Sequence, residues 1–406
     1  MSDPVQAGPV VLFENIHPVA DVAFDAAGFS IERHAAALEI ADLHTALGPA
    51  RLAGIRSRTK MNRAAFDAAP SLLALGCFCI GTNQVDLDAA AARGIPVFNG
   101  PFGNTRSVAE LTLASIIMLM RGIPMRSAAA QRGEWQKSAT NSHEVRAKKL
   151  GIVGYGNIGS QLSVLASALG MHVYFYDTEP KLAHGNARAC ASLDELLELS
   201  DVVTLHVPST EQTRNIMNAA AIAKMKKGAI LINQARGDLV DIDALAGALE
   251  RGDLIGAAVD VFPKEPASKD EAFVSPLQKF ANIILTPHIG GSTLEAQEAI
   301  GEDVSGKLAR YVALGATKGA VNVPEIEPGQ IRAGRTRLLS FHSNAPGFLS
   351  RLNDAVSASG ANIAAQHLET RGELGYVAAD LEGDIPTGFI DHVRALDGSI
   401  RARLVR

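Results

Sequence analysis

The glycine-rich segment Gly154-Tyr-Gly156-Asn-Ile-Gly159 constrains the fold of this chain more than any other part of the sequence. Its G-x-G-x-x-G spacing is a weak signal alone, but it follows the apolar run 150–153 and opens a helix-like stretch that ends near Gly170. A second apolar run then ends at Asp177. This order of strand, glycine turn, helix and strand predicts a doubly wound parallel α/β sheet.

The same segment predicts a Rossmann-like dinucleotide site. Gly154 permits the tight turn, Gly156 lets the backbone approach a pyrophosphate, and Gly159 lets the helix pack closely on the strand. The N–H groups at the helix N-terminus would donate to the phosphates. Asp177 would bind the adenosine ribose hydroxyls and repel a 2′-phosphate, so NAD is predicted in preference to NADP. A purely structural glycine turn is the alternative.

Apolar runs alternate with helix-like stretches in two long parts of the chain, which indicates parallel sheets with helices on both faces. The predicted strands are 10–13, 52–56, 72–77 and 95–99 in the first part, and 150–153, 172–176, 202–207, 229–233, 256–261 and 283–286 in the second. Between the parts, Ser107 and Glu110 have capping-box spacing, so we predict a helix that begins at Ser107, runs to Met120 and is buried between domains.

The last part of the chain reads as a separate unit. A long helix is predicted over 293–313, and the Pro- and Gly-containing stretch 319–334 reads as a linker. The remainder has the order βαββαβ, with strands at 336–343, 363–370, 376–381 and 400–405 and helices at 346–359 and 389–396. This order predicts a ferredoxin-like α+β domain.

Composition excludes several classes of protein. Lys and Arg number 38 against 43 Asp and Glu, a net charge of −5, so no basic surface for nucleic acid or membrane is expected. Three cysteines are too few for a disulfide framework and favour a reducing, cytoplasmic setting. Cys77 and Cys79 lie on one side of a strand, so core packing is favoured over metal binding, and no metal site is predicted. The N-terminal residues resemble no secretory signal.

Three polar residues, Arg236, Glu265 and His288, each follow the end of a predicted strand in the second part. Ligands of open parallel sheets bind at that edge, so the three side chains can converge there. A histidine can take the proton of an alcohol while its hydride leaves, a carboxylate can orient the imidazole, and an arginine can hold a carboxylate. Each residue alone reads as structural or surface charge; their joint placement suggests a dehydrogenase.

Three segments of the second part resemble the signatures of the D-isomer-specific 2-hydroxyacid dehydrogenases: 232–237, 258–266 and 286–293. A further resemblance, to the short bacterial branch of that family with an ACT domain, is carried by 75–86, 104–110 and the C-terminal unit. The resemblance implies a flavodoxin-like, discontinuous substrate domain (1–103 and 291–332), a Rossmann-like NAD domain (104–290) and an ACT domain (335–406). It implies Arg236, Glu265 and His288 as catalytic residues. The implied NAD residues are Gly154, Tyr155, Gly156, Asn157, Ile158, Gly159, Asp177, Gln234, Ala235, Arg236, Asp260, His288, Ile289, Gly290 and Gly291. Gln234 departs from the family's small residue, with only a local change expected near the ribose.

A phosphorylated substrate needs a second anion site, and Arg56-Ser57-Arg58 follows a strand end where two guanidiniums can face a phosphate. By residues alone these arginines also read as solvated surface charges. With Asn104, they are the substrate residues that the resemblance implies, and D-3-phosphoglycerate is the implied substrate, oxidised with NAD in the first step toward serine. Dehydrogenation of D-lactate, glycerate or 2-hydroxyglutarate, and a non-enzymatic NAD(H)-sensing corepressor, are the alternatives.

The resemblance also implies regulation and assembly. ACT domains pair through a sheet edge and hold an amino acid, here L-serine, for which His342, Asn344 and Asn362 are the candidate residues. The first strand of this unit ends near His342 and Asn344, and Asn362 begins the strand that we expect beside it. Asn344 and Asn362 read equally well as turn and cap residues. The family forms tetramers, and Trp135, the only tryptophan, lies in a polar stretch that suggests an interface or a cleft edge.

Overall fold

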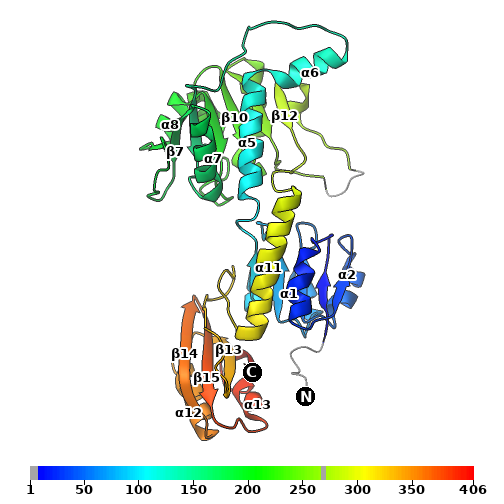
Figure 1. Cartoon of the computed structure of the whole chain (residues 1–406), viewed down its shortest axis with the longest axis vertical. Helices are drawn as coiled ribbons and strands as arrows, with labels where there is room; N and C mark the ends of the chain where they lie inside the picture. The colour runs from blue at the N-terminus through cyan, green and yellow to red at the C-terminus, as the bar shows by residue number, and fades with distance from the viewer. Residues whose placement is uncertain (1–7, 267–270) are drawn as a thin grey trace. The chain divides into compact units, whose positions relative to one another are not determined.

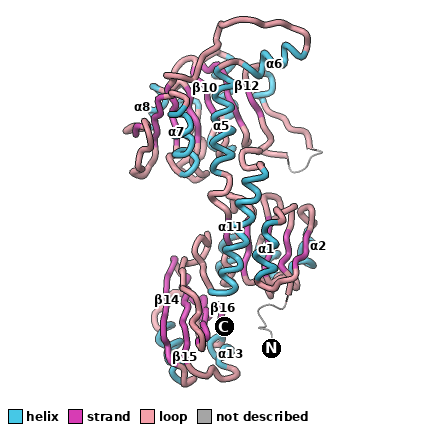
Figure 2. Tube along the Cα trace, in the orientation of Figure 1, coloured by secondary structure: helices cyan, strands magenta, loops and turns pink. Residues whose placement is uncertain are grey.

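The computed structural model describes residues 8–266 and 271–406. The chain divides into two compact units, one made of Met1–Gly103 with Gln297–Arg406 and the other of Asn104–Ala296. Each unit contains a parallel sheet, and the first unit also contains a separate antiparallel sheet near the C-terminus (Figure 1). Figure 2 distinguishes the strands, in magenta, from the helices, in cyan.

The parallel sheet of the first unit has the order β2-β1-β3-β4-β5. Its strands are β1 (Val10–Leu12), β2 (Ile31–Arg33), β3 (Leu52–Ile55), β4 (Ala74–Cys77) and β5 (Val97–Asn99). This is the flavodoxin-like order, in which the chain reverses direction across the sheet between β1 and β3. The predicted strands are present, and β2 is additional: this edge strand is partly exposed and lacks an apolar run.

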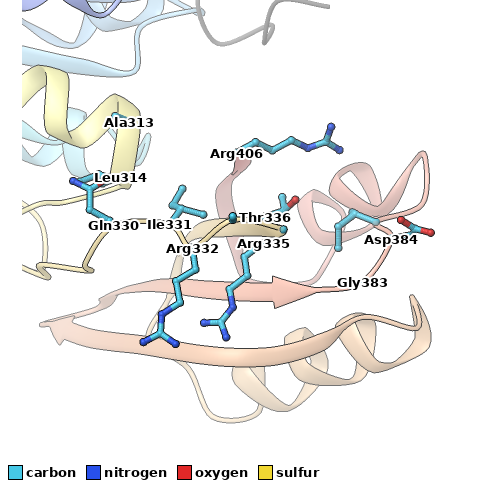
Figure 3. Close-up of a pocket in the computed structure, with 13 residues that line it drawn as sticks. Ala313, Leu314, Gln330, Ile331, Arg332, Arg335, Thr336, Gly383, Asp384 and Arg406 are labelled. Carbon is cyan, nitrogen blue, oxygen red and sulfur yellow. The ribbon is translucent and has the colours of Figure 1, made fainter.

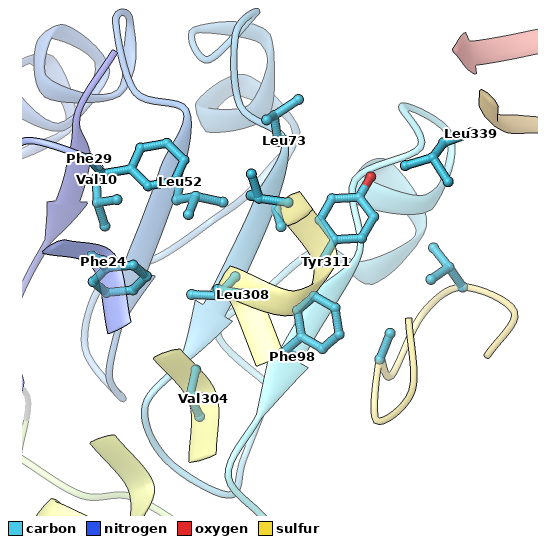
Figure 4. Close-up of a cluster of buried hydrophobic side chains, with 14 of the residues drawn as sticks. Val10, Phe24, Phe29, Leu52, Leu73, Phe98, Val304, Leu308, Tyr311 and Leu339 are labelled. Carbon is cyan, nitrogen blue, oxygen red and sulfur yellow. The ribbon is translucent and has the colours of Figure 1, made fainter. Parts of the chain in front are cut away.

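Both faces of this sheet are buried, which is why its strands read as continuous apolar runs. Val10 belongs to one core and its neighbour Val11 to the other, because successive side chains point to opposite faces. The helices of this unit are α1 (Val19–Ala26), α2 (Ile40–Leu47), α3 (Arg63–Asp67), α4 (Leu87–Ala91) and most of α11 (Leu294–Leu314). Figure 4 shows Val304 and Leu308 of α11 packed near Leu52 and Phe24.

The sheet of the second unit has the order β8-β7-β6-β9-β10-β11-β12, all parallel. Its strands are β6 (Lys149–Val153), β7 (His172–Tyr176), β8 (Arg188–Ala189), β9 (Val202–Leu205), β10 (Ala229–Asn233), β11 (Leu254–Val259) and β12 (Ile283–Leu285). The order of the first six strands is that of the Rossmann fold, with its reversal between β6 and β9. All six predicted strands are present; the exposed two-residue β8 gave no apolar signal.

Helices cover both faces of the second sheet. They are α5 (Thr105–Met120), α6 (Ile123–Gln131), α7 (Asn157–Ala168), α8 (Leu193–Leu199), α9 (Ala219–Lys224) and α10 (Ile242–Glu250). Figure 1 shows α5 and α7 side by side on one face. Two short 3₁₀ turns, η2 (Gly237–Leu239) and η3 (Pro276–Lys279), complete the unit.

The predicted start of α5 is wrong. The helix begins at Thr105 with Asn104 as its N-cap residue, and Ser107 and Glu110 form no capping box. The Ser107 hydroxyl instead bonds the Thr293 hydroxyl at 2.7 Å, and Glu110 pairs with Arg106, so other partners take both side chains. The buried face of α5 packs on α7 and the sheet within its own unit.

The predicted end of α5 is confirmed. The helix stops at Met120, Gly122 adopts a left-handed φ of 58°, and α6 follows with Pro124 in its first turn. No single described helix is long and apolar enough to cross a membrane; α5 and α6, bent by 68°, meet the length and composition requirements only as a pair.

The C-terminal sheet has the order β14-β15-β13-β16, antiparallel throughout. It comprises β13 (Arg335–Ser343), β14 (Asn362–Arg371), β15 (Leu374–Glu382) and β16 (Ser399–Val405), with α12 (Phe348–Ala358) and α13 (Phe389–Arg394). This is the predicted ferredoxin-like arrangement. Leu338 faces the helices, whereas its neighbour Leu339 joins the core of the first parallel sheet, so both faces of β13 are buried.

Buried polar contacts join this C-terminal sheet to the end of α11. The Arg337 guanidinium pairs with Asp380 at 2.5 and 3.0 Å and also donates to the Leu314 carbonyl. The Tyr376 hydroxyl donates to the Gly315 carbonyl at 2.8 Å. Each of these buried polar groups has a hydrogen-bond partner, so it can be buried without the cost of an unsatisfied donor or acceptor.

A groove of about 890 Å³ lies where the linker enters β13 (Figure 3). Its lining includes Arg332, Arg335, Arg406 and Asp384. Arg335 pairs with Glu382 at 2.6 Å, so the positive charge of the lining is partly neutralised. Arg335, which lines the groove, is the first residue of β13, and Ser343 is the last. The groove therefore lies at the opposite end of this strand from Ser343.

Candidate active site

The glycine turn after β6 has the geometry of a dinucleotide cradle. Gly154 has a φ of 93°, and a Cβ there would lie 2.6 Å from the His206 carbonyl oxygen. A Cβ at Gly159 would lie 2.2 Å from the Gly154 carbonyl oxygen. Packing therefore requires glycine at both positions. A Cβ at Gly156 would meet no atom of the described residues within 4 Å, so this glycine faces open space, as the predicted approach of a pyrophosphate requires.

The N-terminus of α7 supplies the donors that such a pyrophosphate needs. Gly156 is the N-cap residue, and no side chain in the described part of the chain caps the helix. The first N–H groups of a helix have no intrahelical acceptor, and the helix dipole favours an anion there. Tyr155 contributes only its backbone, since its ring stacks on Phe175 at 3.8 Å and its hydroxyl lies 2.6 Å from the Ser163 hydroxyl.

Asp177 lies at the end of β7, the strand beside β6. Its carboxylate accepts the Tyr155 N–H at 2.8 Å and the Glu179 N–H at 3.0 Å. These bonds fix the carboxylate, and each oxygen keeps a lone pair for a ribose hydroxyl. The residues present thus fit the adenosine half of NAD.

His288 and Glu265 form a pair at the carboxyl edge of the same sheet. His288 Nδ1 lies 3.1 and 3.0 Å from the two carboxylate oxygens of Glu265. The other ring nitrogen, Nε2, has no partner among the described residues, and 53% of the His288 side chain is exposed. A carboxylate on one nitrogen and an accessible second nitrogen is the arrangement of a general base.

The pair shifts the pKa values of both groups. The hydrogen bond to Glu265, together with the charges of Glu265 and Asp260, raises the pKa of His288 despite its partial burial and the nearby Arg236. Burial would raise the pKa of Glu265, but His288, the Phe262 N–H and Arg236 together lower it. The carboxylate therefore stays ionised and favours the imidazolium that forms when the histidine accepts a proton.

The loop that carries His288 is held by Asp260, which is buried after β11. The Asp260 carboxylate accepts the N–H groups of Ile289 and Gly290, each at 2.8 Å, and the Thr286 hydroxyl at 2.6 Å. The Asp260 carbonyl accepts the His288 N–H at 2.8 Å. His288 has a left-handed φ of 56°, an uncommon conformation that these bonds hold in place. Asp260, a predicted NAD residue, thus lies beneath the loop.

Arg236 follows β10, and the Asn233 side chain fixes its backbone. The buried Asn233 donates from its amide to the Arg236 carbonyl at 2.8 Å. Gln234 turns its side chain into α5, where its amide oxygen accepts the Thr112 hydroxyl at 2.6 Å and its nitrogen donates to the Ser115 hydroxyl at 3.2 Å. The sequence analysis did not predict this contact with α5, because Thr112 and Ser115 lie far away in sequence; the local change expected near the ribose stays a prediction.

Asn104, a predicted substrate residue, is buried at the start of α5 in the second unit. Its side-chain nitrogen would lie 2.6 Å from a Cβ at Gly291, a predicted NAD residue, so a larger residue there would displace the Asn104 side chain. Its side-chain oxygen is buried and has no hydrogen-bond partner among the described residues. A buried acceptor of this kind suits a ligand that donates to it.

Arg56, Ser57 and Arg58 follow β3 at the carboxyl edge of the first sheet, next to β1, where the sheet reverses direction. Ser57 and Arg58 are exposed and Arg56 is half-buried. Ligands of open α/β sheets bind at such a reversal. The loop is anchored by the buried Glu14, a residue that the sequence analysis missed; an acid directly after an apolar strand was the available signal.

Comparisons with known proteins agree with this geometry. Residues 113–290 match the family described as D-isomer specific 2-hydroxyacid dehydrogenase, NAD binding domain. The D-3-phosphoglycerate dehydrogenase of Haemophilus influenzae is 55% identical over 396 residues, which are 97% of this chain and 96% of that protein. The chain belongs to the D-isomer specific 2-hydroxyacid dehydrogenase family.

Further comparisons identify the cofactor as NAD. The D-3-phosphoglycerate dehydrogenase of Escherichia coli (strain K12) is 52% identical over 398 residues, 97% of either chain. The crystal structure of D-lactate dehydrogenase from Aquifex aeolicus, complexed with NAD and lactic acid, is 29% identical, has a TM-score of 0.64, and matches over 75% of this chain and 95% of that one. This dehydrogenase is thus an NAD-dependent oxidoreductase. No group of three or more His, Cys, Asp or Glu among its described residues could hold a metal ion.

The C-terminal sheet of this dehydrogenase separates the predicted effector residues. His342 is buried and its ring stacks on Phe348 at 4.1 Å, and Asn344 donates to the Gly372 carbonyl at 3.0 Å. Asn362 was expected beside the end of β13, which is wrong: β15 lies between β13 and β14, and Asn362 pairs with Glu382 at the opposite end of the sheet. One copy of the chain therefore does not bring the three residues together.

Proposed function

We propose that this dehydrogenase oxidises D-3-phosphoglycerate to 3-phosphohydroxypyruvate with NAD, the first step of L-serine synthesis by the phosphorylated route. The observation that carries the proposal is 55% and 52% identity, over 97% of the chain, to proteins named D-3-phosphoglycerate dehydrogenase. We assign substrate binding to residues 1–103 and 291–332, NAD binding to 104–290, and effector binding to 335–406.

His288 is the proposed base. Its Nε2 takes the proton of the substrate's 2-hydroxyl, and bound NAD⁺ would supply the acceptor for the hydride. Glu265, bonded to Nδ1, stabilises the resulting imidazolium, in keeping with the raised pKa of His288. Arg236 holds the α-carboxylate and polarises the developing carbonyl. In reduction of the keto acid, His288 returns the proton.

Arg56 and Arg58 are the proposed phosphate ligands. A phosphate offers several acceptor oxygens in a geometry that guanidinium forks match. The location of their loop at the reversal of the first sheet supports this role. D-Lactate and D-glycerate would leave both guanidiniums without an anion, which disfavours these acids as the main substrates. The second carboxylate of 2-hydroxyglutarate offers two acceptor oxygens where a phosphate offers three, so this acid is expected to bind less well.

An assay of the purified protein tests the reaction. NADH absorbance is followed with NAD⁺ and, in parallel, D-3-phosphoglycerate, D-glycerate, D-lactate and D-2-hydroxyglutarate. We expect the highest kcat/KM with D-3-phosphoglycerate. A higher value with an unphosphorylated acid would contradict the substrate assignment. Absence of turnover with every acid, with NADH still bound, would favour the corepressor alternative.

We also propose that L-serine inhibits the enzyme from a site shared by two C-terminal domains. The edge strand β14 is largely exposed over its length, so a second copy can extend the sheet there. Because Asn362 lies far from Asn344 within one copy, a site that uses both needs Asn362 from a second copy. Amino acid bound there would act at a distance by favouring one arrangement of the domains.

Calorimetry with L-serine and the NADH assay test this regulation together. We expect millimolar or lower L-serine to bind and inhibit the parent. Either Asn344→Ala or Asn362→Ala should abolish inhibition while turnover persists; His342→Ala is less suitable because its ring packs on Phe348. If L-serine neither binds nor inhibits the parent, the domain has another role.

For assembly and location we propose a homotetramer in a reducing, cytoplasmic setting. Trp135 is 88% exposed in the single chain, which supports a contact between copies at the NAD-binding unit, and β14 offers the second contact. All three cysteines are free. Sedimentation should give four chains of 42.6 kDa; a monomer at assay concentration would contradict the assembly.

A further inference from the structure

Glu14 has a bonding pattern that no step proposed so far uses. It follows β1 at the carboxyl edge of the first sheet and is 9% exposed. Its Oε1 accepts the N–H groups of Arg56 at 3.1 Å and Thr59 at 2.8 Å, and its Oε2 accepts the N–H of Arg58 at 3.0 Å. One carboxylate thus takes three of the four backbone donors in the loop 56–59.

The backbone around Glu14 is adapted to this contact. Glu14 and Asn15 have left-handed φ values of 63° and 51°, a conformation that is uncommon for glutamate. On the other side of the loop, the Gln84 amide donates to the Arg56 carbonyl at 2.6 Å. Both sides of the loop are therefore held before any ligand arrives, which reduces the ordering cost of binding.

The contact also determines which groups of the loop remain for a ligand. With the N–H groups of Arg56, Arg58 and Thr59 already donating, only the Ser57 N–H of this loop is left for an anion, and the other donors must be side chains. The Arg58 side chain has no hydrogen bond or ion pair among the described residues, and that of Arg56 has only a 3.5 Å contact with the Glu14 carbonyl. Two guanidiniums are thus presented on a loop of fixed shape.

We propose that Glu14 is the positioning residue of the phosphate subsite: its carboxylate sets the conformation of the loop that presents Arg56 and Arg58 to the substrate's phosphate. This inference rests on the proposed function, since it needs a phosphorylated substrate. Glu14 itself does not touch the substrate. A merely structural acid would stabilise the fold without any preference for phosphorylated over unphosphorylated ligands.

Glu14→Gln is the variant that separates these two roles. The amide oxygen of Gln can still accept from Arg56 and Thr59, but its nitrogen would then face the Arg58 N–H, donor against donor. Arg58 is therefore released while volume and burial are kept. Glu32→Gln is the matched control, because Glu32 lies on β2 of the same sheet and pairs with His34 at the surface.

Steady-state kinetics with two acids measure the effect. For Glu14→Gln we expect KM for D-3-phosphoglycerate to rise roughly 10-fold, the size of one lost charge-assisted hydrogen bond, with kcat kept within about 2-fold. KM for D-glycerate and both parameters of Glu32→Gln should stay at parent values. Equal losses on both acids, or no change on either, would overturn the inference.

Inorganic phosphate separates failure of this inference from failure of the proposed function. If the parent does not oxidise D-3-phosphoglycerate, the proposed function fails, and the shift of the unfolding temperature with phosphate then tests Glu14 by itself. A phosphate shift of equal size in the parent and in Glu14→Gln, or none in either, would overturn the positioning role. Should Glu14→Gln not fold, Gln84→Met releases the same loop from its other side, and the same split in KM is required of it.

Discussion

The two parallel sheets of this dehydrogenase each reverse direction once, and each carries candidate site residues at that reversal, yet the two edges use different groups. At the reversal between β6 and β9, the first N–H groups of α7 have no acceptor in the helix and Gly156 faces open space. At the reversal between β1 and β3, Glu14 accepts three of the four backbone N–H groups of the loop 56–59, and the Arg56 and Arg58 guanidiniums remain for an anion.

The difference suggests how one architecture recognises two anions. A cofactor that is always the same can be bound by backbone donors, which glycine and helix geometry place without side chains. A substrate that must be distinguished from its unphosphorylated relatives is better bound by side chains, because removal of the phosphate then leaves charged groups unpaired. We call the carboxyl edge of the second sheet the cofactor edge and that of the first sheet the substrate edge. Binding of the pyrophosphate at the cofactor edge should depend little on side chains, whereas binding of the phosphate at the substrate edge should depend on them.

The largest expected effect concerns the groups that do chemistry at the cofactor edge. His288→Ala should lower kcat by about 10²–10⁴-fold, because it removes the positioned base. NADH binding, measured by fluorescence titration, should stay near the parent value, since backbone donors and Asp177 carry it. Turnover within a few-fold of the parent would remove His288 from its role.

The next effect concerns the substrate edge. Arg58→Ala or Arg56→Ala should raise KM for D-3-phosphoglycerate roughly 10- to 100-fold, the size of a lost charged hydrogen bond in an anion site. KM for D-glycerate should change much less. Steady-state kinetics on both acids provide the measurement, and equal losses would assign the arginines to structure.

A smaller effect is expected in the choice of cofactor. Asp177→Ala removes the carboxylate that repels a 2′-phosphate, so the ratio of kcat/KM for NADH to that for NADPH should fall toward one. The ratio is measured in the direction of keto-acid reduction. A parent enzyme that already uses NADPH as well as NADH would contradict this role of Asp177.

The smallest effect is a displacement of the pH profile. Glu265 raises the pKa of His288, so the neutral imidazole that we propose as the base predominates only above that raised value. In Glu265→Gln the pKa falls, and the acid limb of kcat/KM for oxidation should move to lower pH. An unmoved acid limb, measured between pH 5 and 9, would show that another group controls the profile.

Sequence patterns predicted the cofactor edge better than the substrate edge, for a physical reason. Glycines in the turn after β6 are required by contacts between near neighbours, such as Gly159 with Gly154, so the requirement is visible locally. Glu14 bonds residues more than 40 positions away, and an acid after a strand looks like a solvated charge until the neighbouring strand is known. Ser107 likewise bonds Thr293, a residue distant in sequence, and does not cap α5 as predicted.

Strand order explains the error at the candidate effector residues. The spacing of apolar runs indicated βαββαβ at the C-terminus, and the structure has this order. The ferredoxin-like arrangement places β15 between β13 and β14, but the expectation that Asn362 lies beside the end of β13 took only the order along the chain into account. The edge strands β2 and β8 were not predicted either. Little of their surface is buried, so their sequences contain no apolar run that would indicate a strand.

The central claim is that the cofactor and the substrate's phosphate are recognised at two separate edges, and one comparison of two variants on two pairs of ligands tests it most directly. In the parent, Arg58→Ala and Asp177→Ala, kcat/KM is determined for D-3-phosphoglycerate against D-glycerate with NAD⁺, and for NADH against NADPH in keto-acid reduction. Arg58→Ala should reduce only the preference for the phosphorylated acid, and Asp177→Ala only the preference for NADH. If either variant reduces both preferences to a similar extent, the two edges do not act as separate recognition sites and this account is wrong.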